Sequence, residues 1–495
     1  MYIGDILVAR GLVTKAEITA ALELQGNRGK GLGACLVELG CLAPEDLDSV
    51  VTAAPARPNS IEATGISTPD LLNLLMKSLH AGGEATPSKL SDTLKLPHHT
   101  VQDLLEEADD RRLLAVLGAV RLETGSEIRY NLTEKGRQWA QAALERSRYV
   151  GPAPVSLAAY QQQIQAQRIS AERINHACVH SAFSDLVVGE SLVLEVGPAL
   201  NSGRSILLYG PPGNGKSSIA ERIGRAFQNV IYVPYCFEVD GEIIKVFDPA
   251  VHTEIKREAG RRESSAFLNR EDFDQRWVAC SRPLIVTGGE LSLEMLDLNF
   301  NAETRFYEAP LHIKGLGGIF MIDDFGRQLI SPAALLNRWI VPMESRVEYL
   351  KLPTGKTFSL PFDELVIFCT NLTPSDLMDP AFLRRIPYKI ELAGPTPAEF
   401  REIFRREAAA ARMEATDAVI DYIIARLCED GERSLACYQP RFIIDQVRTS
   451  CEFMGAERKF QTRFIDMALK NLHAEATAST IEREHANTAP TANAA

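Results

Sequence analysis

Short apolar runs alternate with amphipathic stretches in the middle of the chain. This alternation predicts an α/β domain over 174–393, with a parallel sheet covered by helices on both faces. Residues 394–473 have only helical patterns and predict an all-helical lid. Residues 218–227 have helical periodicity and predict the first helix after the strand at 205–209. The strands are expected at 205–209, 317–322, 365–370 and 388–392.

Residues 67–148 predict a separate α+β domain. The pattern gives three helices, a β-hairpin with a turn at Gly125, and a last helix that Thr133 would cap. That order resembles a winged helix-turn-helix. The helix that would read DNA carries acids that a phosphate backbone would repel, so a protein-contact or spacer role is favoured. These acids are Asp103, Glu106, Glu107, Asp109 and Asp110.

The first 54 residues contain an internal repeat, which predicts a small helical repeat domain over 1–54. Each half would form a short helix, a turn and a second amphipathic helix. We expect a linker at 55–66, a linker helix at 149–173 and a disordered tail at 474–495. The repeat aligns Gly4, Leu7, Gly11 and Ile18 with Gly33, Leu36, Gly40 and Leu47.

Composition narrows the possible classes of function. The 495 residues carry a formal net charge of -12, which disfavours general nucleic-acid binding. The nine cysteines show no C-x-x-C pair and no metal spacing, as is usual for reduced thiols. No run approaches the roughly 18 apolar residues that a membrane-spanning helix needs. We therefore expect a cytoplasmic protein without membrane insertion.

A complete phosphate-binding loop lies between the first predicted strand and its helix. Its glycines let backbone N–H groups surround a β-phosphate, and Lys216 would reach the β and γ oxygens. The Ser217 hydroxyl is a natural Mg²⁺ ligand beside a helix N-terminus. The sequence thus predicts ATP and Mg²⁺ as cofactors. The expected contacts are Gly210, Pro211, Pro212, Gly213, Asn214, Gly215, Lys216, Ser217 and Ser218.

Polar residues at two further strand ends complete the predicted chemistry. Asp323 and Asp324 follow an apolar strand, at the sheet edge where open α/β folds bind ligands. Asp323 would hold Mg²⁺ directly or through water, and Asp324 would polarise an attacking water. Asn371 ends the next strand and would hydrogen-bond the γ-phosphate and that water. A charged strand end and a capping amide are the alternative interpretations.

Three arginines are candidates for charge stabilisation during phosphoryl transfer. Arg385, with Arg384 as second candidate, is placed to act as a finger supplied by a neighbouring subunit. Arg441 begins a helix of the predicted lid and would reach back to the γ-phosphate. Surface salt bridges are the alternative roles of Arg384 and Arg385.

Residues 174–473 resemble an AAA+ ATPase module, on the basis of these motifs and their order. Val188 and Gly189 stand in a segment similar to the one that lines the adenine pocket of that superfamily. Residues 346–362 predict a hairpin around Gly355 that is similar to the one before the first sensor in the MoxR-type clade. The resemblance implies ATP hydrolysis in a homo-oligomeric, hexameric ring that remodels or escorts a protein client.

Departures from the resembled families leave other functions open. The second acid is usually Glu in AAA+ proteins and is Asp324 here, so an ATP-binding switch with little turnover is one alternative. A winged-helix transcription regulator with an ATPase motor is another. The N-terminal repeat resembles the first domain of type II secretion and type IV pilus assembly ATPases, some of which bind cyclic di-GMP. Tyr2, Gly31 and Ala54 replace residues of that binding motif, so only the fold is expected to be shared.

Overall fold

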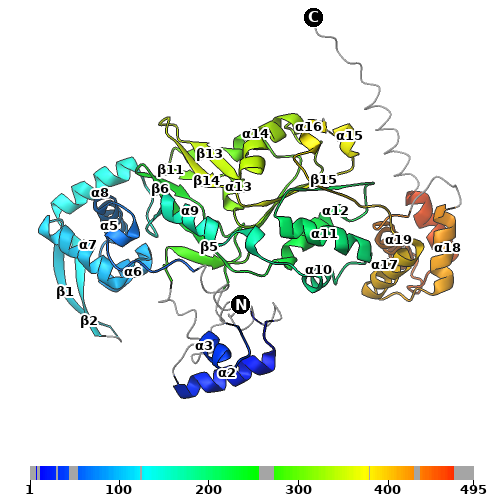
Figure 1. Cartoon of the computed structure of the whole chain (residues 1–495), viewed down its shortest axis with the longest axis horizontal. Coiled ribbons are helices and arrows are strands. Elements are labelled where there is room, and N and C mark those ends of the chain that lie inside the picture. The colour runs from blue at the N-terminus through cyan, green and yellow to red at the C-terminus, as the bar shows by residue number, and fades with distance from the viewer. Residues whose placement is uncertain are drawn as a thin grey trace, which may run out of the picture.

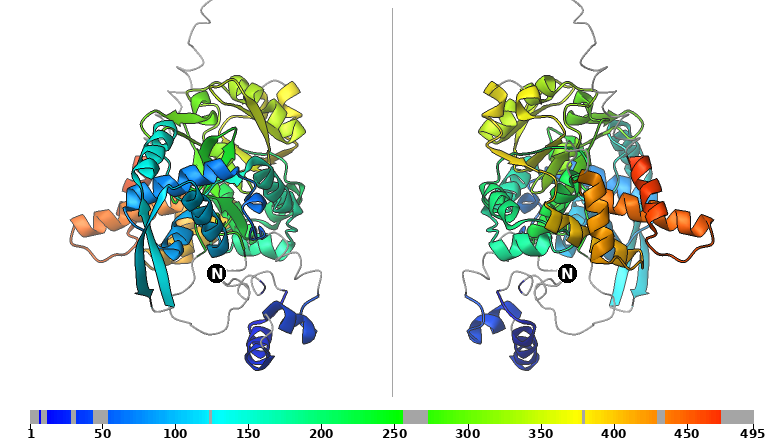
Figure 2. Two further views of the ribbon diagram at one scale, coloured as in Figure 1. Left: turned by 90° about the vertical axis from the view of Figure 1, so that its left-hand side faces the viewer. Right: turned by 90° about the vertical axis from the view of Figure 1, so that its right-hand side faces the viewer.

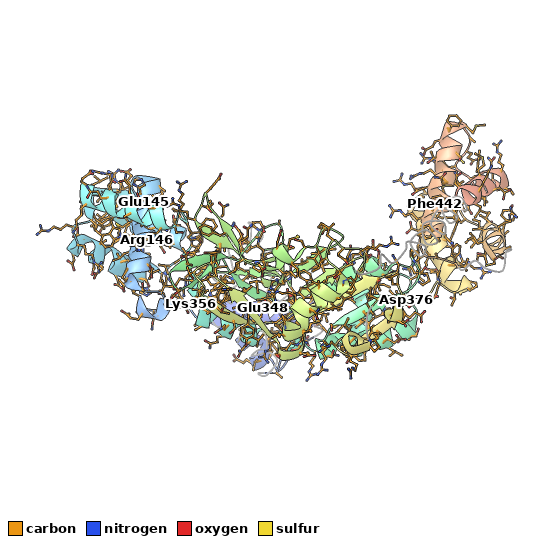
Figure 3. The ribbon with its side chains drawn as sticks, turned by 90° about the horizontal axis from the view of Figure 1, so that it is seen from above. Glu145, Arg146, Glu348, Lys356, Asp376 and Phe442 are labelled. Carbon is orange, nitrogen blue, oxygen red and sulfur yellow. The ribbon has the colours of Figure 1, made fainter. Side chains whose placement is uncertain are left out.

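The computed structural model describes most of the chain as an elongated molecule (Figure 1). The helices of residues 68–146 lie at one end, and the helices after residue 396 lie at the other. Figure 3 shows the same arrangement from above, with Glu145 and Arg146 at one end and Phe442 at the other. The structure describes residues 7, 12–28, 32–43, 54–122, 125–255, 273–377, 380–428 and 435–472.

A five-stranded parallel sheet forms the centre of the molecule and confirms the predicted α/β class. The strands have the order β16-β4-β15-β12-β9. Four of them lie where the sequence predicts strands, whereas β9 was not predicted. The five strands are β4 (Ile206–Tyr209), β9 (Leu284–Thr287), β12 (Ile319–Ile322), β15 (Leu365–Thr370) and β16 (Tyr388–Glu391).

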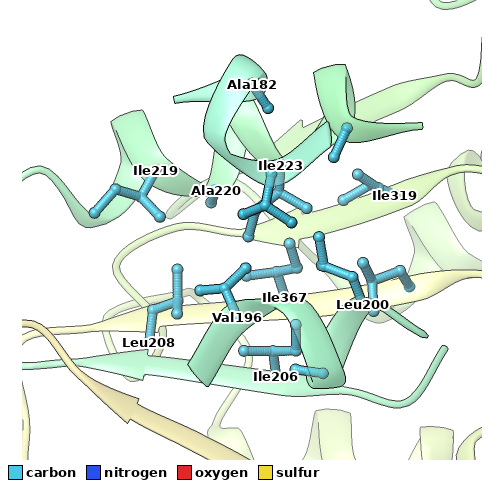
Figure 4. Packing of buried hydrophobic residues seen from close by; sticks show 14 of the residues in the cluster. Ala182, Val196, Leu200, Ile206, Leu208, Ile219, Ala220, Ile223, Ile319 and Ile367 are labelled. Atoms are coloured by element: carbon cyan, nitrogen blue, oxygen red, sulfur yellow. The ribbon is translucent and has the colours of Figure 1, made fainter. Parts of the chain in front are cut away.

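The strands of this sheet bury both of their faces. Alternate residues of a strand point to opposite faces, so Ile206 and Leu208 pack on one side and Leu207 on the other. On the first side they meet Val196 of α11 and Ile223 of α12 (Figure 4). Helix α14 covers the second side. The covering helices are α10 (His176–Ala182), α11 (Glu190–Ser202), α12 (Lys216–Ile223) and α14 (Pro332–Ser345).

A second, mixed sheet combines two strands between α12 and β9 with one strand before α12 and two after β9, and the sequence did not predict it. Its order is β10-β11-β7-β6-β3, and a separate antiparallel pair, β5 with β8, shares its core. Tyr160 is buried in that core against Phe237, with ring centroids 5.0 Å apart. The strands are β3 (Val155–Ser156), β5 (Ile231–Pro234), β6 (Cys236–Val239), β7 (Glu242–Lys245), β8 (Trp277–Cys280), β10 (Asn299–Asn301) and β11 (Phe306–Glu308).

The two segments expected as linkers differ from that expectation, because both are packed. Residues 149–173 supply β3 and α9 (Leu157–Ala166), whose Tyr160 fills the second core. Residues 55–66 are held by Arg276, which is 3% exposed and donates from Nη1 to the carbonyl of Thr64 at 2.9 Å. The same nitrogen donates to Pro154, also at 2.9 Å. Both segments thus pack between the 68–146 unit and the second sheet and are bonded by Arg276.

Residues 68–146 show the predicted order of elements. Three helices precede an antiparallel hairpin and a last helix, and the Thr133 hydroxyl caps that helix by accepting from the N–H of Gly136 at 3.1 Å. The hairpin of β1 and β2 projects from the helices (Figures 1 and 2). The winged-helix assignment remains a prediction. The elements are α5 (Thr68–Gly82), α6 (Pro87–Leu94), α7 (His98–Asp110), β1 (Leu114–Leu122), β2 (Gly125–Leu132) and α8 (Glu134–Arg146).

The C-terminal part is helical, as predicted for the lid. Thr396 and Glu399 form a capping box at the start of its first helix. A further helix spans 462–472, and the last predicted segment, 474–495, lies outside the described residues. The labelled helices are α17 (Pro397–Ala410), α18 (Asp417–Cys428) and α19 (Gln439–Phe453).

Two smaller predictions concern the hairpin and the N-terminus. The predicted hairpin forms between β13 (Val347–Lys351) and β14 (Thr357–Pro361). At the N-terminus, α2 (Lys15–Arg28) and α3 (Leu32–Glu38) share a small core. Much of the predicted repeat, including Tyr2 and Gly31, lies outside the described residues.

Within the described part of the chain, we find no helix of the length and apolar character needed to cross a membrane.

Candidate nucleotide-binding site

The glycine-rich loop joins the carboxyl end of β4 to the first turn of α12. Gly213 and Gly215 have φ angles of 79° and 78°, a left-handed conformation that glycine adopts without steric cost. A Cβ on Gly215 would meet no heavy atom within 4 Å, so open space adjoins the loop there. The exposed Pro211 and Pro212 form its outer part. The loop therefore has the backbone shape and free space that a phosphate group requires.

Lys216 is the first residue of α12, and its ammonium group lies across the loop. Its Nζ donates to the carbonyls of Gly210 at 2.9 Å and Pro211 at 2.8 Å, and the residue is 7% exposed. Burial lowers the pKa of Lys216, while nearby acidic groups, including Asp323 and Asp324, oppose that shift. The lysine thus places its charge beside the loop, where a phosphate would compete with two neutral carbonyls for it.

Ser217 and Asp323 bring the loop and β12 together. The Ser217 hydroxyl donates to Asp323 Oδ2 at 2.8 Å. The Asp323 N–H donates to the carbonyl of Thr287 at 2.8 Å, so the end of β9 positions the acid. A hydroxyl and a carboxylate in contact are oxygen ligands of the kind that Mg²⁺ prefers. The Ser217–Asp323 pair is therefore the candidate metal site. Among the described residues, no group of three or more His, Cys, Asp and Glu is placed to hold a metal.

Asp324 lies in a tight turn directly after Asp323. Its φ of 48° is left-handed, and its N–H donates to Asp323 Oδ1 at 3.0 Å. Asn371 Nδ2 donates to Asp324 Oδ1 at 3.1 Å. Three strand ends, those of β4, β12 and β15, therefore contribute to one polar site, as the sequence predicted for parallel neighbours.

The turn after Asp323 is held by Gln328, whose role the sequence did not suggest. Gln328 Nε2 donates to the carbonyl of Asp323 at 2.8 Å, and its Oε1 accepts from the N–H of Gly326 at 2.8 Å. The Phe325 N–H donates to the carbonyl of Cys369 in β15 at 2.7 Å. These bonds fix the acids relative to the neighbouring strand. A glutamine in a polar turn carries no signal in a single sequence.

The start of α19 contacts the glycine-rich loop directly. The N–H of Tyr438 donates to the carbonyl of Gly213 at 3.1 Å, and a Cβ on Gly213 would lie 2.3 Å from Cδ1 of the Tyr438 ring. Asn214 is 5% exposed, and its Oδ1 accepts from the N–H of Cys437 at 3.4 Å. The Asn214 Nδ2 is buried without a hydrogen-bond partner in the described structure. A buried donor without a partner at this loop suits an anionic ligand.

Arg441 is on the same helix of the lid as the residues next to Tyr438. Arg441 is exposed and lies one helical turn after Tyr438 on α19. The role of Arg441 stays a prediction, and the contact of Tyr438 with the loop was not predicted.

Other predicted contacts lie at the edges of this region. Gly189 begins α11 and faces Glu399 of the lid, whose Oε1 would be 3.0 Å from a Cβ on the glycine. Val188 packs against the core beneath α11. Ser218 continues α12, and its carbonyl accepts a long bond, 3.5 Å, from Nη1 of Arg222. The structure places Val188 and Gly189 between the central sheet and the lid.

Arg384 and Arg385 lie at the amino ends of the central strands, whereas Lys216 lies at their carboxyl ends. The Arg385 carbonyl accepts from the hydroxyl of Ser205 at 3.2 Å, and Ser205 precedes β4 whereas the loop follows β4. A four-residue strand spans roughly 13 Å. Arg385 Nε donates to Glu344 Oε1 at 2.6 Å. The structure therefore does not bring Arg384 or Arg385 into the site of their own chain.

Comparisons with known proteins identify no family for the whole chain. A family model described as a domain of unknown function (DUF8689) matches residues 396–471. No curated protein sequence matches the chain. A point mutant of RuvB from Thermotoga maritima is similar at a TM-score of 0.32 and 16% identity, over 62% of this chain and 73% of that one. The RuvB Holliday junction branch migration motor of the same organism is similar at a TM-score of 0.31 and 17% identity, over 64% of this chain and 72% of that one.

Proposed function

We propose that this chain binds ATP with Mg²⁺ and hydrolyses it as an AAA+-type ATPase, at sites shared between neighbouring copies. The observation that carries the proposal is the convergence of Ser217, Asp323, Asp324 and Asn371 in one hydrogen-bonded group beside Lys216. Phosphoryl transfer to water requires charge neutralisation and an oriented water, and these side chains are suited to both tasks.

Each residue of this group has a distinct part in the proposed reaction. Lys216 binds the β and γ oxygens once it leaves the two carbonyls, and Ser217 with Asp323 holds the metal ion. When bound, Mg²⁺ neutralises charge on the β- and γ-phosphates. Asp324 accepts a hydrogen bond from the attacking water and orients it, and Asn371 keeps the Asp324 carboxylate in position.

Each site is proposed to receive its finger arginine from a neighbouring copy, because Arg384 and Arg385 are absent from the site of their own chain. Arg385, with exposed Arg384 beside it, lies at the amino edge of the sheet. In a ring of identical subunits that edge would face the next subunit's nucleotide. Arg385 must then exchange Glu344 for a phosphate oxygen. We propose a hexameric ring on the basis of the resemblance described above.

A protein client is the proposed target of the motor. Tyr349 on the β13–β14 hairpin is 59% exposed, which leaves an aromatic ring available for contact. By contrast, Asp103, Glu106, Asp109 and Asp110 all lie exposed along α7, which disfavours DNA as the target. A link to secretion or pilus assembly remains a hypothesis that residues 1–54 suggest.

Steady-state phosphate release tests the proposed activity. The wild-type chain should release phosphate from ATP in the presence of Mg²⁺, and Lys216→Ala should abolish that release. A second candidate function, an ATP-binding switch, is favoured by Asp324, whose side chain is one methylene shorter than the usual Glu. Equal rates for the wild type and Lys216→Ala, together with ATP binding by the wild type alone, would establish the switch instead.

A further inference from the structure

A cavity of about 550 Å³ opens at the amino edge of the central sheet, away from the glycine-rich loop. Its lining includes Ser205, Val366 and Pro387, which lie at or just before the starts of β4, β15 and β16. The glycine-rich loop follows the other end of β4. Cavities of 300–1,000 Å³ are typical of sites for small molecules.

Four arginines line this cavity: Arg204, Arg346, Arg384 and Arg385. Burial lowers the pKa of the Arg346 guanidinium; Asp363 opposes that shift, while Arg204 and Arg168 add to it. Only two acids line the cavity with them, and one of these, Glu344, is paired with Arg385. The cavity therefore gathers positive charge, which an anionic ligand would offset.

The second acid, Glu364, is buried and unpaired. It is 1% exposed, and neither of its carboxyl oxygens has a hydrogen-bond partner in the described structure. Burial, and then the nearby Asp363 and Glu348, raise the pKa of Glu364 well above its usual range. This shift favours the neutral form of Glu364, which carries no charge to offset the arginines.

The remaining wall of the cavity is apolar. It consists of Met343, Phe362, Val366 and Pro387. Guanidiniums match phosphate oxygens in pairs of parallel hydrogen bonds, and an apolar wall suits a base or another flat ring. We propose that the cavity binds a free nucleoside phosphate, with its phosphates on the arginines and its base against the apolar wall.

This second site is separate from the glycine-rich loop and does not depend on ATP hydrolysis. Arg384 and Arg385 are assigned to the proposed contact between subunits, so Arg204 and Arg346 are the arginines that would hold the phosphates of the free ligand. Arg346 donates from Nη1 to the backbone carbonyl of Glu364 at 3.3 Å, so the two form one part of the lining.

Calorimetric titration of the full chain with ADP tests the proposal in a Lys216→Ala background, which disables the glycine-rich loop. We expect one ADP site per chain. Adding Arg204→Ala should weaken ADP binding by roughly tenfold or more, because one charged contact to phosphate is lost. Arg204 is exposed, so its removal should not disturb folding. Arg129→Ala is the matched control. Arg129 is on β2, far from the cavity, and pairs with Glu84.

Three results would overturn the proposal. The first is the absence of ADP binding to Lys216→Ala. The second is an equal affinity of the Arg204→Ala and Arg129→Ala variants. The third is that inorganic pyrophosphate binds as tightly as ADP, because the apolar wall would then contribute nothing and the ligand would not be a nucleoside phosphate.

Discussion

Asn371 donates a hydrogen bond from Nδ2 to Oδ1 of Asp324 across 3.1 Å. This bond links the end of β15 to the turn after β12, and the left-handed φ of Asp324, 48°, sets the direction in which its carboxylate points. Gln328 supports the same turn from the other side by bonding the Asp323 carbonyl. The carboxylate that would orient water is thus held by the Asn371 amide, which follows the neighbouring strand β15.

Asn371→Ala should slow hydrolysis without preventing ATP binding. Because the carboxylate of Asp324 would lose its orienting amide, we expect kcat to fall on the order of 10²-fold while KM changes little. Steady-state phosphate release over a range of ATP concentrations provides both constants. An unchanged kcat would show that the Asn371 amide does not orient the reacting groups.

Ser217→Ala should impair the metal site. The variant loses an oxygen ligand and the hydrogen bond to Asp323 Oδ2, so the Mg²⁺ concentration needed for half-maximal activity should rise on the order of tenfold. A magnesium titration at saturating ATP measures this change. Ser88→Ala is the matched control, since Ser88 bonds Glu127 far from the site. A normal Mg²⁺ requirement in Ser217→Ala would exclude the hydroxyl as a ligand.

The central site could be predicted because its residues follow strands that the sequence reveals. Parallel strands end at one edge, so Lys216, Asp323 and Asn371 had to converge once β4, β12 and β15 were recognised. The β9 strand was not predicted, although it is as short and apolar as β4 and β12, because no candidate site residue directly follows it.

Contacts between distant segments were beyond what the sequence pattern could show. Residues 55–66 have the composition of a linker, yet their Thr64 is bonded by Arg276, 212 positions away. Tyr438 meets Gly213 in the same way, through tertiary packing between the lid and the loop. Local periodicity reports burial along one element and carries no information about which distant residue completes the contact.

Gly213→Ala should disturb the contact between the lid and the loop. The new methyl group would lie 2.3 Å from the Tyr438 ring, at a backbone φ of 79° that disfavours any side chain by about 1–2 kcal/mol. We expect weaker ATP binding, measured by calorimetry. Tyr438→Ala in the same chain should recover part of the affinity by removing the clash. No recovery would mean that backbone strain alone accounts for the loss.

Lys77 should make stability depend on pH. It is 4% exposed in α5, and burial lowers its pKa from 10.5 to about 8. Between these values the unfolded chain binds more protons than the folded one, so stability should rise with pH there. Lys77→Met should remove this rise. It should also stabilise the fold at pH 7 by on the order of 2 kcal/mol, after allowing for the lost bond to Ser147.

Urea unfolding of the wild type and Lys77→Met at pH 7 and pH 9 measures this effect. Exposed Lys89 provides the control variant Lys89→Met, which should keep the pH dependence of the wild type. If Lys77→Met shows that same dependence, the buried ammonium does not control it.

The most direct test of a shared active site is to mix two inactive variants. Lys216→Ala disables the nucleotide side of an interface, and Arg385→Ala disables the finger side. In rings co-assembled from equal amounts, we predict recovery of roughly a quarter of wild-type phosphate release, because that fraction of interfaces combines an intact Lys216 with a neighbour's intact Arg385. If co-assembled rings remain as inactive as each variant alone, the two residues do not act across one interface.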